Sequence, residues 1–289
     1  MRKAPKRLLI NLGFAFATLA MMSCGSGGGD PITDPTITDP VKITSTGATQ
    51  PQWLDNDTIV YRYASDLYTV DIYSGESDLF LDLPSEPIGG TEYSLSPDET
   101  ELAYSVLRDA QGFYLMMIVS VSSGEELTIS PYGSSFYHPA FSPDGNSVAS
   151  IRGFSKIVVF ERNEIGNWTN RIIHEASVHG ISWSPSMDRI AFIHESNIWT
   201  VNLDGGEATQ LSDQGTVANS IHWSSDGSFI AYSKNSGGIG AYYLSDGSTR
   251  TIVYASDSPS MGSLSPDGTL IAGHKWGDGQ PDIWVWPVE

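Results

Sequence analysis

The sequence has little cysteine and little positive charge. Its 289 residues include one cysteine, so no disulfide can form within the chain. Lysine and arginine number 15 against 34 acidic residues, which gives a formal net charge of -19. Because so negative a surface repels the phosphate backbone, we expect no nucleic acid among the partners.

Common catalytic motifs are also missing. The sequence has no Gly-x-Ser-x-Gly nucleophile elbow and no glycine-rich phosphate-binding loop. The stretch from His174 to His179 is similar to a zinc-protease motif, but it has one residue too many and is expected to span two strands rather than a helix. We therefore predict no enzymatic activity and no cofactor.

The N-terminus has the features of an export leader. Four cations in the first seven residues precede an apolar stretch from Leu8 to Met22, which is too short for a comfortable membrane span. The single cysteine, Cys24, follows at once. This arrangement resembles the lipobox of bacterial lipoproteins, with Met21 where that box usually has leucine. A plainly cleaved signal peptide and an uncleaved anchor are the alternatives.

The resemblance implies that residues 1–23 are removed and that Cys24 carries a lipid, with the membrane as a partner through that anchor. Gly25 in place of aspartate implies, by the enterobacterial sorting rule, an outer-membrane lipoprotein that faces the periplasm or the cell surface. Residues 24–40 then form a tether, flexible at Gly25–Gly29 and stiffened by the prolines that follow.

The rest of the chain is built from a repeated phrase. An aromatic residue or leucine is followed by a Ser-Pro-Asp-Gly-like turn and a short apolar strand, as in Phe141–Ser150 and Leu264–Gly273. The lead residues of the six copies are Trp53, Leu95, Phe141, Trp183, Trp223 and Leu264, spaced by 42, 46, 42, 40 and 41 residues. A period near 42 residues made of short strands is typical of a β-propeller, with one repeat per blade.

Each repeat predicts a four-stranded antiparallel blade. In the fourth repeat we expect strands at 179–184, 189–194, 197–203 and 207–211, separated by turns at Pro185–Asp188 and Asp204–Gly206. The sixth repeat ends after its third strand, Ile283–Glu289. We expect Val41–Ser45 to complete that blade, so residues 41–289 form an all-β, six-bladed propeller whose ring is closed by the N-terminal strand.

These repeats resemble the TolB-type propeller repeat, which also occurs in prolyl-oligopeptidase-like enzymes. The resemblance rests on the Trp-Ser-Pro-Asp-Gly phrase, on Ile198–Glu207 and on the outer strand Ala208–Ser212. TolB itself has an additional N-terminal α/β domain, whereas here a leader and a tether precede the propeller. The resemblance implies a scaffold that binds another envelope protein.

The repeated phrase is interpreted as scaffold. A proline and an aspartate followed by glycine are what a tight turn needs, so Asp98, Asp144, Asp226 and Asp267 are predicted to accept backbone N–H bonds rather than to bind metal. The lead aromatics alternate with leucine at the same position and are predicted to pack between blades.

A candidate site comes from the position of the inner strands, which line the channel of a propeller. Residues three or four places before each lead residue are expected at one mouth of this channel: Gln50, Glu92, His138, His179, Asn219 and Ser260. Such a ring of polar groups could hold a ligand or a partner's side chain, or could line a water-filled channel in which water satisfies their hydrogen bonds. Two functions stay open, a binding propeller without enzymatic activity and a metal-assisted lactonase or lyase that uses Glu92, His138 and His179.

Overall fold

The computed structural model describes residues 36–44, 47–83, 93–107, 111–254, 260–277 and 279–288. The chain divides into two units, Met1–Pro35 and Thr36–Glu289, and the description concerns the second. The predicted leader, Cys24 and most of the tether therefore lie outside the described residues. Within the described ranges, no helix is long and apolar enough to cross a membrane.

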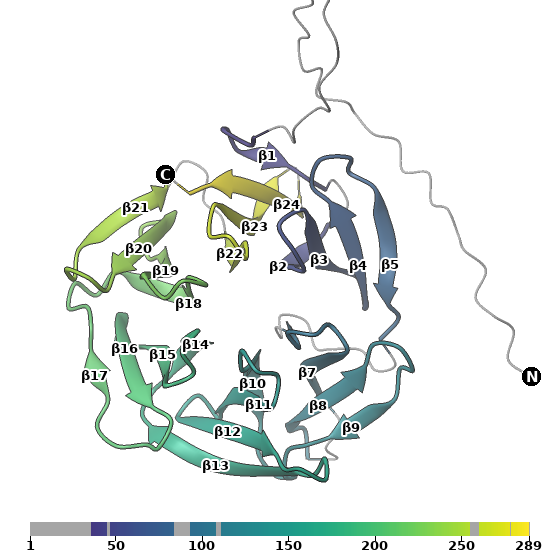
Figure 1. Cartoon of the computed structure of the whole chain (residues 1–289), viewed down its shortest axis with the longest axis vertical. Helices are drawn as coiled ribbons and strands as arrows, with labels where there is room; N and C mark the ends of the chain where they lie inside the picture. Colours follow the sequence, from purple (N-terminus) through teal and green to yellow (C-terminus); the bar gives the residue numbers. More distant parts are fainter. Residues whose placement is uncertain are drawn as a thin grey trace, which may run out of the picture. The chain divides into compact units, whose positions relative to one another are not determined.

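Six four-stranded antiparallel sheets make up this unit, and they are arranged around a central axis (Figure 1). The first three blades are β2 (Thr49–Trp53), β3 (Thr58–Tyr63), β4 (Asp66–Asp71) and β5 (Ser77–Leu81); β6 (Tyr93–Leu95), β7 (Glu101–Leu107), β8 (Tyr114–Ser120) and β9 (Glu126–Thr128); and β10 (Phe136–Phe141), β11 (Ser147–Arg152), β12 (Lys156–Arg162) and β13 (Trp168–Glu175).

The other three blades follow in chain order. They are β14 (His179–Trp183), β15 (Arg189–His194), β16 (Asn197–Asn202) and β17 (Thr209–Gln210); β18 (Val217–Trp223), β19 (Phe229–Lys234), β20 (Ile239–Tyr243) and β21 (Thr249–Val253); and β22 (Ser260–Leu264), β23 (Leu270–Gly277) and β24 (Gln280–Pro287), completed by β1 (Val41–Lys42). The predicted all-β, six-bladed fold is confirmed.

The ring closes through the pairing of β1 with β24, as predicted, although the ladder is shorter than 41–45. Val41 lies opposite Val285 and Lys42 opposite Trp284. The Ile43 N–H donates to the Ile283 carbonyl at 2.8 Å, and the Ile43 side chain packs against the core between blades six and one. This pairing covers the outer edge of β24, which an open ring would expose.

Neighbouring blades are joined by apolar cores that lie between their sheets. Between blades two and three, Met116 and Ile118 pack with Phe136 and Phe160. The lead residue Trp183 is 7 % exposed and packs among residues of blades three and four. The period-two alternation of the strands therefore buries one side of each sheet against the preceding blade and the other against the next.

A buried serine organises the turn after the inner strand in five of the blades. In blade three the Ser142 hydroxyl donates to Asp144 Oδ1 at 2.6 Å and accepts the Ser147 N–H at 3.0 Å. Asp144 Oδ1 in turn accepts the Asn146 N–H at 3.0 Å. The equivalent serine–aspartate pairs are Ser96–Asp98, Ser184–Asp188, Ser224–Asp226 and Ser265–Asp267.

The same hydrogen bonds stabilise the ionised carboxylates. The Ser228 N–H and the hydroxyls of Ser224 and Ser228 lower the pKa of Asp226 below its ordinary value. The hydroxyls of Ser96 and Thr100 lower the pKa of Asp98. These aspartates are hydrogen-bonded acceptors within turns, as the sequence predicts.

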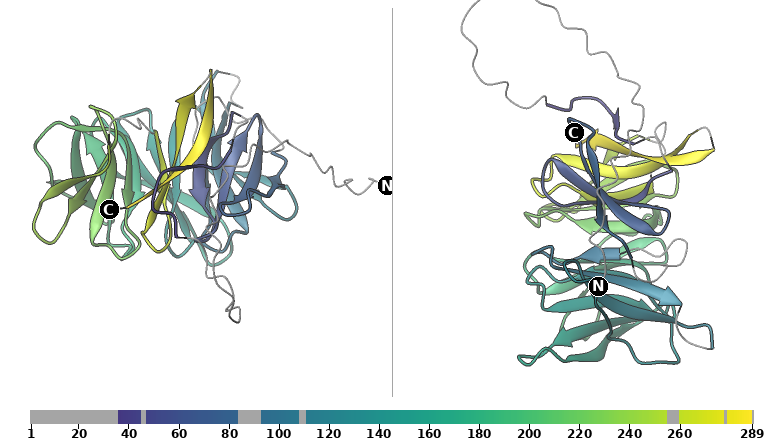
Figure 2. Two further views of the ribbon diagram at one scale, coloured as in Figure 1. Left: turned by 90° about the horizontal axis from the view of Figure 1, so that it is seen from above. Right: turned by 90° about the vertical axis from the view of Figure 1, so that its right-hand side faces the viewer.

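The two faces of the ring differ in composition. Because the strands are antiparallel, first-to-second and third-to-fourth turns gather on one face, which we call the turn face, while second-to-third turns and the connections between blades gather on the other, the loop face (Figure 2). Acids dominate the turn face; examples are Asp55, Asp71, Asp98, Asp144, Asp188, Asp204, Asp226, Asp246 and Asp267. On the loop face Arg62, Arg152, Lys156, Lys234 and Lys275 accompany the acids.

Ring closure can be tested with the Ile43→Asp variant. A carboxylate at this half-buried position should lower the free energy of unfolding by about 2 kcal/mol, because it removes apolar packing and buries a charge. Urea unfolding followed by tryptophan fluorescence measures the change. The matched control is Val41→Asp on the same strand but exposed, which should cost less than about 1 kcal/mol. Equal effects of the two substitutions would contradict a closing role for Ile43.

The turn aspartates should contribute a pH-dependent stability. The lowered folded-state pKa of Asp226 stabilises the protein above the unfolded-state pKa, near 3.9, and this contribution is lost as the pH falls through the folded-state pKa. Asp226→Asn should therefore be less stable than the parent at pH 6, by no more than about 1 kcal/mol for so exposed a group. Urea unfolding from pH 6 to 2.5 should show the difference closing below pH 4, and a difference independent of pH would contradict it.

Candidate functional site: the central channel

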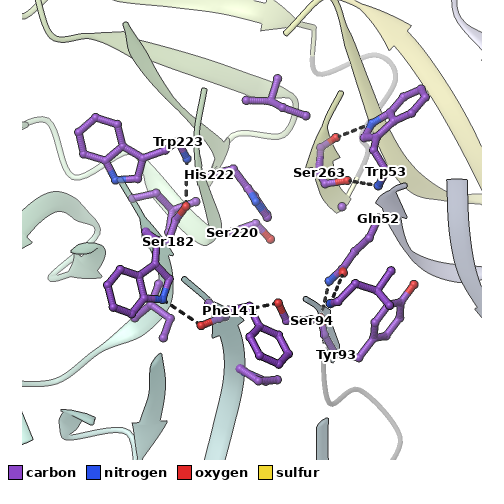
Figure 3. Close-up of a pocket in the computed structure, with 18 of the residues that line it drawn as sticks. Gln52, Trp53, Tyr93, Ser94, Phe141, Ser182, Ser220, His222, Trp223 and Ser263 are labelled. Carbon is purple, nitrogen blue, oxygen red and sulfur yellow. Dashed lines mark hydrogen bonds between the residues drawn. The ribbon is translucent and has the colours of Figure 1, made fainter. Parts of the chain in front are cut away.

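A cavity of about 580 Å³ lies on the axis of the ring, lined by residues from all six inner strands (Figure 3). Gln52, Ser220 and His222 point into it, and the aromatic side chains of Trp53, Phe141 and Trp223 lie around it. Prolines of the serine–aspartate turns, such as Pro97 and Pro266, line its end at the turn face. The channel thus combines polar groups near the axis with aromatic groups behind them.

The described part of the channel wall has a different composition from the rest of the chain. Among the described residues that line the cavity there is no aspartate, glutamate, lysine or arginine. This contrasts with the chain as a whole, which has a net charge of -19. The carboxylates of the turns are instead directed into their own hydrogen bonds.

In four blades the side chain of the residue just before the lead residue links neighbouring blades. Ser94 Oγ accepts the Phe141 N–H of the next blade at 3.0 Å, and Ser182 Oγ accepts the Trp223 N–H at 3.0 Å. Ser263 Oγ accepts the Trp53 N–H at 3.1 Å, across the closure of the ring. In the same position of blade one, Gln52 accepts the Leu95 N–H at 3.4 Å and donates to the Tyr93 carbonyl.

Blade three departs from this pattern because Ala140 has no side-chain acceptor. There the backbone carbonyl of Ala140 accepts the Trp183 indole N–H at 2.9 Å. The Trp53 indole makes the equivalent bond to the Ser263 carbonyl at 3.2 Å. Trp53 and Trp183 therefore both pack between blades and donate hydrogen bonds across the junction, whereas the buried indole N–H of Trp223 has no partner among the described residues.

Two histidines line the cavity. His222 occupies the position before the lead residue in blade five, and His274 reaches the cavity from β23. Burial lowers the pKa of His274, so its ring is neutral at pH 7. Its buried Nδ1 has no hydrogen-bond partner within the described part of the chain. Neither histidine belongs to the set predicted from the sequence.

Of the four predicted channel residues whose side chains the structure describes, two line the cavity and two do not. Gln50 and Asn219 line the cavity, whereas His138 and His179 lie on β10 and β14 and are not among its lining residues. Ser260 is the first residue of β22, and its side chain is not described. Glu92 lies outside the described residues.

His138 and His179 differ in level because they lie three and four residues before their lead residues, on inner strands that carry a bulge at the same place. The ladder shifts register between Tyr137 and Ala140 in blade three and between His179 and Ile181 in blade four. His138 has φ 51°, and the residue equivalent to it in blade four is Gly180, with φ 66°, rather than His179. Gly180 was the one signal in the sequence that could have revealed this shift, because glycine favours positive φ.

The described residues contain no cluster of three or more His, Cys, Asp or Glu side chains arranged to hold a metal ion.

Comparison with known proteins identifies the family. A model of the TolB beta propeller domain matches residues 57–281. The chain belongs to this family. No curated protein matches the sequence.

Solved structures similar to this TolB-family chain include both a TolB and enzymes. A protein described as a TolB from Agrobacterium tumefaciens is 15% identical, with a TM-score of 0.62, over 87% of this chain and 97% of that one. A gluconolactonase from Xanthomonas campestris is 12% identical, with a TM-score of 0.63, over 86% and 89%. An oligogalacturonate lyase from Vibrio parahaemolyticus is 16% identical, with a TM-score of 0.59, over 86% and 80%. At these identities the likeness shows the fold alone.

The hydrogen bonds between blades can be tested at Ser182. Ser182→Ala leaves the Trp223 N–H without its acceptor and should lower the free energy of unfolding by about 1 kcal/mol. The control is Ser220→Ala, whose hydroxyl faces the cavity (Figure 3) and whose removal should change stability by less than about 0.5 kcal/mol. Thermal and urea unfolding measure both, and equal effects would contradict a structural role for Ser182.

Proposed function

We propose that this protein is a lipid-anchored, protein-binding propeller of the bacterial cell envelope, without enzymatic activity of its own. The observation that carries the proposal is that polar side chains of the channel wall are engaged in hydrogen bonds between blades. The side chains of Gln52, Ser94, Ser182 and Ser263 accept backbone N–H groups of the neighbouring blade. Their lone pairs hold the ring together, which favours a structural channel over a catalytic one.

The charge of the channel supports the same conclusion. Lactonase or lyase chemistry on acidic sugars needs a base and cationic or metal groups near the reacting carbon. Among the described residues that line the cavity there is no acid, lysine or arginine, and the bases among them are His222 and His274. The alternative enzyme also needs His138 and His179 at one level, whereas they lie three and four residues before the lead residues of equivalently bulged strands.

Membership of the TolB family supports a binding role. A propeller presents two broad faces on a rigid frame, and such a frame suits recognition of another protein without chemistry. Because the fold is shared with enzymes such as the gluconolactonase, the proposal depends on the site rather than on the fold.

The anchor and the location rest on the sequence. The leader, Cys24 and the glycines after it support lipidation, and the tether leads into β1 at the closure of the ring. We place the protein on the outer membrane, facing the periplasm or the cell surface, with an envelope protein as its partner.

The proposal predicts both an anchor and a partner. A photo-cross-linking amino acid at Tyr132 on the loop face, at Ile165 on the turn face or at Gln52 in the channel should capture a specific envelope protein in cells at native expression. Cys24→Ser should abolish labelling by a lipid precursor and release the protein from the membrane fraction. The control is unirradiated cells.

The outcomes separate the two parts of the proposal. Absence of a specific cross-link at all three positions would contradict the binding function. Membrane retention of Cys24→Ser with unchanged lipid labelling would contradict the anchor. Hydrolysis or elimination of acidic oligosaccharides by the purified protein, lost on substitution of His222 or His274, would instead establish the enzyme.

A further inference from the structure

An aromatic patch lies on the loop face across blades two and three. It consists of four residues from the end of β7, the start of β8, the start of β10 and the turn between β11 and β12. These are Leu107, Tyr114, Tyr137 and Phe154. Leu107 is 50% exposed and Phe154 is 47% exposed, while both tyrosines are half-buried. Large apolar side chains are therefore presented to solvent at one place on a strongly charged protein.

The rings of the aromatic patch are in contact with one another. The rings of Tyr137 and Phe154 stack with their centroids 4.4 Å apart and their planes inclined by 16°. Tyr114 lies against Tyr137, with ring centroids 5.3 Å apart. Leu107 lies directly opposite Tyr114 in the ladder of blade two. The aromatic patch is thus a continuous surface that spans a junction between blades.

The backbone around the aromatic patch is held by three blades. The Tyr114 N–H donates to Ser135 Oγ at 3.2 Å, and the Gly153 N–H donates to the Ser135 carbonyl at 3.0 Å. The Phe154 carbonyl accepts the Val178 N–H, from the connection into blade four, at 3.1 Å. A surface held in this way loses little conformational entropy when it binds.

Phe154 has a left-handed backbone conformation, which a bulky residue does not favour. Gly153 and Phe154 have φ values of 57° and 57°, so both central residues of this tight turn lie in the left-handed region. Asparagine and glycine are preferred there, and a bulky residue is strained. Because nearly half of its side chain is exposed, burial compensates little for this strain. Such a residue points to a role outside folding.

A cation accompanies the aromatic patch. Arg152, two residues before Phe154, donates to Ser134 Oγ at 2.7 Å. No carboxylate of the described residues lies within ion-pair distance of it. Its ladder neighbour Lys156 is paired with Glu175 at 2.7 Å. Arg152 is therefore a guanidinium available for a carboxylate from outside, in a chain whose own acids are in large excess.

We infer that the aromatic patch and Arg152 form the docking surface for a protein partner that presents an aliphatic or aromatic side chain beside a carboxylate. This inference rests on the proposed binding function and names its surface. Tyrosine, phenylalanine and arginine are typical of the centres of protein interfaces. The turn face, with its many carboxylates, would repel the same acidic partner.

A displayed library of random peptides, selected on the full-length protein, tests the inference. The selected peptides should carry aspartate or glutamate next to leucine or an aromatic residue. Phe154→Ser and Arg152→Glu should each weaken their binding roughly tenfold or more, as expected for central interface residues. The matched control is Ile165→Ser, on the turn face of the same blade and 81% exposed, which should leave binding unchanged.

Circular dichroism and thermal unfolding confirm that each variant is folded. Removing the strained Phe154 from its turn should not destabilise the fold, so lost binding reports on the surface. The inference would be overturned if peptide binding were unchanged by substitution of Phe154 or Arg152 but weakened by substitution of Ile165 or Gln52. So would failure to enrich any peptide, or self-association through the aromatic patch seen by light scattering. A cross-link at Ile165 or Gln52 alone would preserve the proposed function and reject this surface.

Discussion

The buried serine hydroxyl in the turn after the inner strand constrains much of the architecture. It donates to the turn aspartate and accepts the N–H five residues later, so it fixes the first two strands of a blade relative to each other. In blade three these bonds involve Ser142, Asp144 and Ser147. With this geometry fixed, the residue before the lead residue faces the axis and the lead residue faces the junction between blades. The hydrogen bonds between blades and the apolar cores depend on that orientation.

This construction separates support from recognition. The channel residues Ser94 and Ser182 join adjacent blades, and the turn carboxylates hold the turns. These polar groups of the channel wall and the turns are thus committed to the scaffold. The loop face instead carries side chains that the fold does not need, above all Phe154 in its left-handed conformation. This contrast is the physical basis for proposing binding at a face rather than catalysis at the axis.

The architecture could be predicted from the sequence because each blade is specified locally. The alternation of strands, the Asp-Gly turns and the incomplete sixth repeat all lie within short segments, and the addition of β1 to the sixth blade followed from counting strands. The channel residues were harder to predict. The inner strands bulge at His138 and Gly180, three residues before the lead residue, so residues three and four places before it are not interchangeable, and in the sequence only Gly180 indicates the bulge.

His274 could not have been found from the repeat. The equivalent residues of the other blades differ widely in chemistry: Arg62, Ser105, Ile151, Ile193 and Ser233. Likewise, the aromatic patch joins residues from separate repeats, and no single repeat contains its pattern. Contacts across a blade junction depend on the curvature of the ring, which cannot be predicted from a single sequence.

The closing strand also determines how the ring responds to mechanical force. A pull on the chain before residue 36 reaches the propeller through Ile37, which packs on the core between blades six and one, and then through β1. The backbone bonds of β1, the Lys42–Asp282 ion pair and the bond from the Ile283 N–H to Thr44 Oγ1 join this segment to β24. Tension would detach β1 before any other strand and expose the edge of β24. The strand that completes the sixth blade is therefore also the element expected to yield first under tension on the N-terminal segment.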